Sequence, residues 1–127
     1  MLDTSVLIAQ ETARVLRSER LPEQTTVSVV TVGELQAGVL AAGDTATRAR
    51  RLATLEAVSV VEALPVTVKA ARRWVELRVR LAEQGHRAKL NDLWTAAVAL
   101  ANGMDVVTQD DDFDVIEQAG GPAVIRV

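Results

Sequence analysis

Short β-branched, apolar runs alternate with longer segments of helical periodicity along the whole chain. The runs span residues 1–4, 26–30, 58–61, 105–108 and 123–127. Strands that alternate with helices predict a parallel sheet, because right-handed crossovers leave few other arrangements. We therefore expect an α/β fold with three layers, in which a central parallel sheet of about five short strands has helices on both faces.

The helical segments are bounded by glycine, proline and polar residues. The longest one, residues 66–84, begins just after Pro65 and ends at Gly85, a natural C-cap. Its inward stripe is predicted to contain Ala71, Val75, Val79 and Ala82, widened by Trp74, Leu77 and Leu81. The other expected helices span residues 5–20, 31–42, 46–57, 90–101 and 112–118.

Length and composition exclude several classes of protein. The 127 residues fit one domain, which we expect to span residues 1–127. No cysteine and a single histidine exclude disulfides, thiolate zinc sites and thiol nucleophiles, so any metal must be held by oxygen. No apolar run approaches the roughly 18 residues of a membrane span, and the first residues do not resemble a secretory signal. We expect a cytoplasmic protein without a membrane partner.

Four carboxylates are expected to meet at one edge of the sheet, the edge where parallel sheets bind ligands. Asp3 ends the first strand, and Glu34 follows the second. Asp92 lies in the first turn of the helix before the fourth strand, and Asp110 comes directly after that strand. Asp112 is close enough to be a fifth member of the group.

Each acid also has a simpler interpretation as a helix cap or turn residue, and taken singly we favour that interpretation. Asp3 would cap a helix, Thr31 and Glu34 would form a capping box, Asn91 and Asp92 would cap and charge the next helix, and Asp110 and Asp112 would serve a turn and the last helix. Together they favour function, because each close pair of like charges costs about 4 kcal/mol at an effective dielectric near 20. A bound Mg²⁺ or Mn²⁺ removes that cost.

Ligation by oxygen alone suits hard divalent ions that are shared with a phosphate. Such an ion generates hydroxide from water and neutralises charge on the phosphate, and a second ion about 4 Å away can stabilise the leaving oxygen. The predicted chemistry is metal-assisted hydrolysis of a phosphodiester. Ser5 and Thr108 offer hydroxyls at the same edge, suited either to orienting a carboxylate or to capping a turn.

Four segments resemble the signature segments of PIN-domain ribonucleases, and among these the VapC toxins of type II toxin–antitoxin pairs. They are LDTSVLI at residues 2–8, SVVTVGEL at 28–35, NDLWTAAVA at 91–99 and VVTQDDDF at 106–113. The resemblance implies Asp3, Glu34, Asp92 and Asp110 as catalytic metal ligands and Asp112 as an auxiliary acid. It also implies an endoribonuclease dependent on Mg²⁺ or Mn²⁺, a cognate VapB-like antitoxin and a homodimer.

Family members usually have several apolar residues before the first aspartate, whereas only Met1 and Leu2 precede Asp3 here. We expect the native start to lie upstream of Met1. Adding two to four native upstream residues should then raise the melting temperature.

The RNA substrate is constrained only by composition. With two tryptophans, one phenylalanine and no tyrosine, the chain has no aromatic platform for a run of single-stranded bases, and both tryptophans fall in apolar helical stripes. We therefore expect a structured target such as tRNA, held through its phosphates. The net charge of −3 does not exclude RNA binding, since the arginines cluster locally. Arg14, Arg17, Arg87 and Lys89 are the candidate phosphate contacts, and His86 is interpreted as a loop residue.

Three alternatives to a nuclease compete for this sequence. An aspartyl-nucleophile phosphatase needs an acid where this chain has Ser5, and a receiver domain needs paired acids at the first strand and a lysine late in the sheet. Both fit worse than a nuclease. The remaining alternative is a catalytically inactive PIN-fold module that binds RNA or protein.

Overall fold

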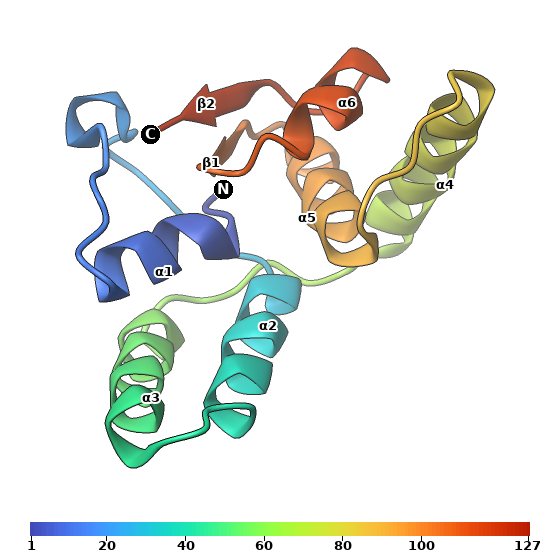
Figure 1. Cartoon of the computed structure of the whole chain (residues 1–127). Coiled ribbons are helices and arrows are strands. Elements are labelled where there is room, and N and C mark those ends of the chain that lie inside the picture. Colours follow the sequence, from blue (N-terminus) through green and yellow to red (C-terminus); the bar gives the residue numbers. More distant parts are fainter.

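The computed structural model describes all residues from 1 to 127. Six α-helices, one 3₁₀ helix and two strands follow one another along the chain (Figure 1). Their bounds are α1 (Thr4–Glu11), η1 (Ser18–Arg20), α2 (Val29–Leu40), α3 (Thr45–Ser59), α4 (Val68–Glu83), α5 (Leu90–Ala101), β1 (Val106–Thr108), α6 (Phe113–Gln118) and β2 (Val124–Arg126). No helix in the structure is long and apolar enough to cross a membrane.

Extended segments lie side by side and run parallel, although only two are long enough to count as strands. β1 pairs with β2 in register, Val107 opposite Ile125. Leu2 bridges to Val107 on the other side of β1, and its amide donates to the carbonyl of Thr26. The last pairing in this row of extended segments is a bridge between Ser28 and Leu64. The parallel sheet is thus confirmed, with the first two expected strands reduced to single bridges and with Leu64 in the place of the third.

Helices cover both faces of this sheet. Neighbouring residues of a strand point to opposite faces. Val106 accordingly packs into a core built largely from α4, α5 and α6. Val107 packs with Val6 of α1 on the other side. In Figure 1, α5 and α4 lie to one side of β1, and α1 lies to the other. The predicted three-layer α/β architecture is confirmed.

The second predicted strand ran two residues too far, and the third was placed wrongly. Val29 and Val30 open α2, which Ser28 caps by accepting a hydrogen bond from the Thr31 amide. Residues 58 and 59 complete α3, where Val58 is buried, while Val60 is 86% exposed. An exposed valine after a helix cannot form a buried strand, so the third extended segment lies at Leu64 instead.

The first predicted helix was also too long. It ends at Glu11, and Ala13 takes a left-handed conformation with φ of 51°. The Arg14 amide then bonds to the carbonyl of Ala9, as in a Schellman cap. Glycine is the usual residue at this position of the cap. Because this chain has Ala13 there, the sequence did not indicate where the helix ends.

The predicted inward stripe of α4 was only partly right. Leu77 and Leu81 are buried, and Trp74 is partly buried against the main core. Val75 and Val79 are instead about half exposed, at 52% and 49%. The helix has apolar residues around more than one face, and packing on α5 selects the face that contains Leu77. The outcome is an apolar strip on the outside of α4.

Candidate active site

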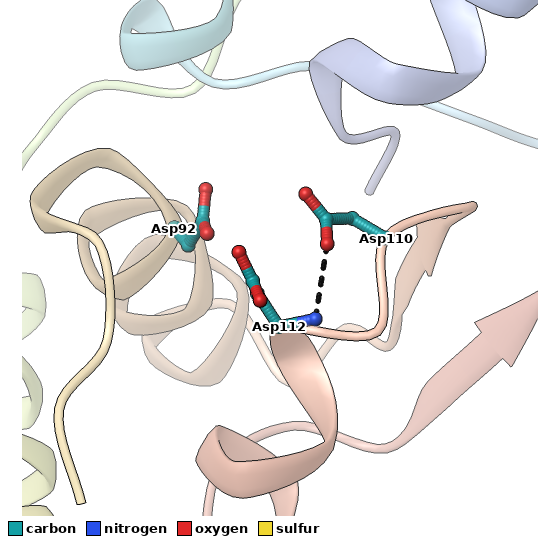
Figure 2. A group of neighbouring side chains, drawn as sticks. All are labelled: Asp92, Asp110 and Asp112. Carbon is teal, nitrogen blue, oxygen red and sulfur yellow. Dashed lines mark hydrogen bonds between the residues drawn. The ribbon is translucent and has the colours of Figure 1, made fainter.

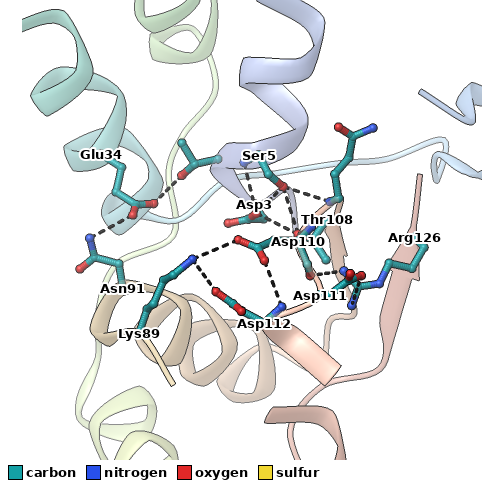
Figure 3. A network of polar contacts seen from close by, with 12 residues as sticks. Asp3, Ser5, Glu34, Lys89, Asn91, Thr108, Asp110, Asp111, Asp112 and Arg126 are labelled. Atoms are coloured by element: carbon teal, nitrogen blue, oxygen red, sulfur yellow. Dashed lines mark hydrogen bonds and ion pairs between the residues drawn. The ribbon is translucent and has the colours of Figure 1, made fainter. Parts of the chain in front are cut away.

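Five carboxylates approach one another at the end of β1; Figure 2 shows Asp92 with Asp110 and Asp112, and Figure 3 shows Asp3 and Glu34 beside the same two aspartates. Asp3 caps α1, accepting a hydrogen bond from the Ser5 amide. Glu34 lies on α2, and Asp92 lies in the first turn of α5. Asp110 and Asp112 follow β1 and lead into α6. The segments that contain them are far apart in sequence, so the fold itself assembles the group.

Asp92, Asp110 and Asp112 form the tightest set (Figure 2). One carboxylate oxygen of each lies within 4.8 Å of the others. The Asp112 amide donates to Asp110 Oδ1 at 3.0 Å, so a tight turn holds these two acids together. Asp112, expected as an auxiliary acid, thus lies in this set, whereas Asp3 and Glu34 flank it. The ligand roles of all five stay predictions.

Asp3 is fixed by hydroxyl groups. Ser5 Oγ and Thr108 Oγ1 both donate to Asp3 Oδ2, at 2.5 and 2.9 Å. Because each hydroxyl has one proton, both are used on this carboxylate. The same two oxygens accept the backbone amides of Gln109 and Asp110, at 3.0 and 2.9 Å. Ser5 and Thr108 therefore tie the position of Asp3 to that of Asp110.

Glu34 is held at the flank of the site by Thr4, which sequence analysis did not single out, and by Asn91, which it considered only as a cap of α5. Thr4 Oγ1 donates to Glu34 Oε2 at 2.5 Å, and Asn91 Nδ2 donates to Oε1 at 3.0 Å. Each partner is a sequence neighbour of a predicted acid, Asp3 or Asp92. The alternative interpretation of Thr31 and Glu34 as a capping box is wrong, since Ser28 caps α2.

Asp92 is the acid of the group whose ionised form a nearby cation would stabilise most. It is 9% exposed, and its Oδ2 is buried without a hydrogen-bond partner. Burial first, and then the charge of Asp3, raise the pKa of Asp92 to about 7. A buried carboxylate oxygen without a donor, beside two more carboxylates, fits a hard divalent cation. The donor set therefore suits Mg²⁺ or Mn²⁺.

Lys89, predicted as an RNA contact, extends into the acid group instead. Its Nζ lies 3.4 Å from Asp110 Oδ2 and forms a closer ion pair with Asp112. These two carboxylates raise the pKa of Lys89 above its ordinary value. In Figure 3 the lysine spans from the start of α5 to both aspartates.

Arg126 on β2 was missed by sequence analysis. Its guanidinium donates to the backbone carbonyl of Asp110 and pairs with Asp114, and it lies 3.6 Å from Asp111. It therefore fastens the loop between β1 and α6 to the edge strand. An arginine in a terminal strand gives no sequence signal for this contact, because the register of β2 cannot be read from sequence.

The remaining candidate phosphate contacts lie at the surface around the site. Arg14 and Arg17 flank Val15, whose carbonyl accepts a hydrogen bond from Gln109 Nε2 beside the acids. Arg87 lines an open hollow together with Lys89, Asp111 and Asp112. All three arginines are exposed. Their contact with RNA stays a prediction, and His86 lies in an exposed loop as expected.

The two tryptophans stack on each other between α4 and α5. Their ring centroids are 4.9 Å apart with an interplanar angle of 15°, and the Arg78 guanidinium lies 5.1 Å from the Trp74 ring. Both rings are partly buried. Trp74 packs against the main core, as predicted.

The profile of the PIN domain family matches residues 1–118. The chain belongs to the PIN-domain family. This PIN domain is 51% identical to ribonuclease VapC5 of Mycobacterium tuberculosis over 127 residues, which cover 100% of this chain and 94% of the relative. It is 37% identical to ribonuclease VapC4 of the same organism, over 89% of this chain and 87% of that protein.

A solved structure supports the same family assignment as these relatives. The crystal structure of VapBC-5, a member of the VapBC family of toxin–antitoxin systems from Mycobacterium tuberculosis, matches with a TM-score of 0.91 and 51% identity. The match covers 99% of this chain and 96% of that one. The resemblance to PIN-domain ribonucleases and to VapC toxins, read from four sequence segments, is confirmed.

Proposed function

We propose that this PIN domain, spanning residues 1–127, is an endoribonuclease that depends on Mg²⁺ or Mn²⁺ and hydrolyses phosphodiester bonds of RNA. The observation that carries the proposal is the buried, partnerless Oδ2 of Asp92 beside Asp110 and Asp112. The 51% identity to a ribonuclease supports the same reaction. Acids in this arrangement suit a bound cation, and a bound cation can promote phosphodiester hydrolysis.

Each acid has a distinct part in the proposed site. Asp92, Asp110 and Asp112 would hold the cation, with Asp3 and Glu34 completing its surroundings for one or two ions. When bound, the cation lowers the pKa of an attacking water and neutralises charge on the phosphate. Ser5 and Thr108 keep the Asp3 carboxylate oriented, and Thr4 and Asn91 do the same for Glu34. Such supporting contacts preserve the geometry that hydrolysis requires.

We infer a structured RNA such as tRNA as the substrate. The two tryptophans are stacked on each other and partly buried, so they offer little surface for single-stranded bases. Phosphates would instead meet the exposed side chains Arg14, Arg17 and Arg87 around the acids. Recognition through phosphates and shape favours a folded RNA.

The proposed biological setting is a toxin–antitoxin pair in the cytoplasm. One structural relative is a member of the VapBC family of toxin–antitoxin systems, which supports a VapB-like antitoxin as partner for this chain. A homodimer is part of the same proposal. The exposed valines of α4, Val68, Val75 and Val79, offer an apolar surface that a second copy would cover.

Cleavage of total tRNA by the antitoxin-free protein tests the activity. With Mg²⁺ or Mn²⁺ present, we expect discrete fragments that disappear on addition of EDTA and in Asp92→Asn. Asp105→Asn is the matched control, because Asp105 is exposed and precedes β1 at the end away from Asp110; it should cleave as the wild type does. Cleavage that survives both EDTA and Asp92→Asn would reveal a contaminating nuclease and remove the support for the proposal.

The second candidate is an inactive PIN module that only binds RNA or protein. Thermal unfolding separates the two, since a ligand that binds only the folded state raises the melting temperature. A nuclease with this site should be stabilised by Mn²⁺, and Asp92→Asn should lose most of that effect. A melting temperature unmoved by Mn²⁺, together with no cleavage of any RNA, would favour the inactive module.

A further inference from the structure

Lys89 has a place in the acid group that RNA binding alone does not explain. Its ammonium lies between Asp110 and Asp112, two of the three carboxylates whose oxygens approach within 4.8 Å of one another. A lysine that served only to bind an RNA phosphate would direct its ammonium group toward solvent. This one is directed into the group that is proposed to hold a cation (Figure 3).

The ion pairs of Lys89 counter a repulsion that the fold creates. Asp92 is buried, and Asp110 and Asp112 lie against it. Without a positive charge nearby, these like charges would oppose the folded state. Lys89 supplies that charge from the residue that precedes α5, three positions before Asp92.

The two ion pairs of Lys89 are nevertheless weak enough to break reversibly. Its side chain is 65% exposed, and the two aspartates are its only ion-pair partners. The lysine stem is flexible and its ammonium is strongly hydrated. The side chain can therefore swing into solvent at little cost once another cation takes its partners.

We propose that Lys89 is a displaceable counter-ion of the site, which neutralises Asp110 and Asp112 until a divalent cation replaces it. The inference rests on the proposed function, because it assumes that these acids bind the cation. Lys89 then sets the cation concentration at which the site loads, since every binding event must first break its two ion pairs. Its removal should tighten cation binding and destabilise the cation-free protein.

The test compares four proteins by Mn²⁺ titration calorimetry and by thermal unfolding in EDTA. Lys89→Met removes the charge and keeps the length of the side chain, whereas Lys89→Arg keeps the charge. Lys69→Met is the matched control, because Lys69 is the only other lysine and is exposed on α4 without an ion pair. The wild type is the fourth protein.

We expect Lys89→Met to bind Mn²⁺ about three- to tenfold more tightly than the wild type, as the loss of two exposed ion pairs would allow. Its melting temperature in EDTA should fall below that of the wild type. Lys69→Met should match the wild type in both measurements, and Lys89→Arg should bind Mn²⁺ no more tightly than the wild type does.

Three results would overturn the inference, and they separate it from the proposed function. Equal Mn²⁺ affinity in all four proteins, or weaker binding by Lys89→Met, would remove the role of Lys89 and leave the metal site intact. A complete lack of Mn²⁺ binding by every protein would overturn both the displaceable counter-ion and the metal-dependent nuclease.

Discussion

Thr108 Oγ1 donates a buried hydrogen bond to Asp3 Oδ2 at 2.9 Å, joining two residues that lie 105 positions apart. The same hydroxyl accepts the amide of Asp110, also at 2.9 Å. A single side chain at the end of β1 therefore sets the spacing between an acid from the start of the chain and an acid from its end. The relative positions of the candidate ligands depend on it.

Thr108→Val keeps the shape of this side chain and removes both hydrogen bonds. We expect the free energy of unfolding to fall by about 1–3 kcal/mol, because the Asp110 amide and the Asp3 carboxylate lose a buried partner. RNA cleavage should fall as well. Thr108→Ser retains the hydroxyl and should restore most of the activity, as measured by urea unfolding and cleavage rates. Full activity in the valine variant would contradict this positioning role.

The pKa of Asp92 predicts how stability depends on pH when no divalent cation is bound. Burial, followed by Asp3, raises this pKa to about 7, whereas an unfolded chain would titrate near 3.8. Between about pH 4 and 7 the folded state therefore holds a proton that the unfolded state has released, so the contribution of Asp92 to stability falls as pH rises.

Asp92→Asn removes that dependence. In EDTA, the stability of the asparagine variant relative to the wild type should rise from pH 4.5 to about 7 and level off above it. Urea unfolding across this range measures the difference between the two proteins. A difference that stays constant with pH would show that Asp92 titrates in the folded protein at its ordinary pKa.

Arg126 should control the order of the loop that contains Asp110. Its guanidinium binds the Asp110 carbonyl and pairs with Asp114, and the side chain is 24% exposed. Arg126→Met should lower the free energy of unfolding by about 1 kcal/mol and weaken Mn²⁺ binding, because Asp110 loses its backbone anchor. Arg72→Met, at an exposed position on α4 without an ion pair, is the control. Unchanged Mn²⁺ affinity in Arg126→Met would rule out the anchoring role.

Asn91 should act through Glu34, whose Oε1 accepts its amide at 3.0 Å. Contacts that orient a metal ligand typically affect activity by about tenfold or more. Asn91→Ala should therefore slow cleavage by about tenfold while the melting temperature changes little. Asn102→Ala, which alters the other asparagine at the far end of α5, should cleave at the wild-type rate. Equal rates in both variants would show that the orientation of Glu34 does not depend on Asn91.

The C-terminal part of the fold, from α5 to β2, was predicted best from the sequence. β1, β2 and α5 lie where the β-branched runs and the alanine-rich segment placed them, since burial and chain direction are both clear from those patterns. The approach of the five acids followed from topology alone, because parallel strand ends share an edge. That argument needed no knowledge of side-chain contacts.

Features decided by local geometry were beyond the sequence. The run at residues 58–61 has a strand-like composition, yet Val58 is buried by helical spacing from Leu55 on α3. The place of Asp112 in the tight set depends on one hydrogen bond in the turn from Asp110. The roles of Thr4, Asn91 and Arg126 depend on contacts between distant segments, which no periodicity records.

The end groups of the RNA fragments test the central claim most directly. When a water activated by a bound cation attacks the phosphorus and the 3′ oxygen leaves, the products have a 5′-phosphate and a 3′-hydroxyl. Attack by the neighbouring ribose hydroxyl, which needs no cation, expels the 5′ oxygen and leaves a cyclic phosphate and a 5′-hydroxyl. We expect 5′-phosphates on fragments made in Mn²⁺, and none after Asp92→Asn. Cyclic phosphates produced equally in EDTA would contradict a metal-dependent hydrolase at this acid group.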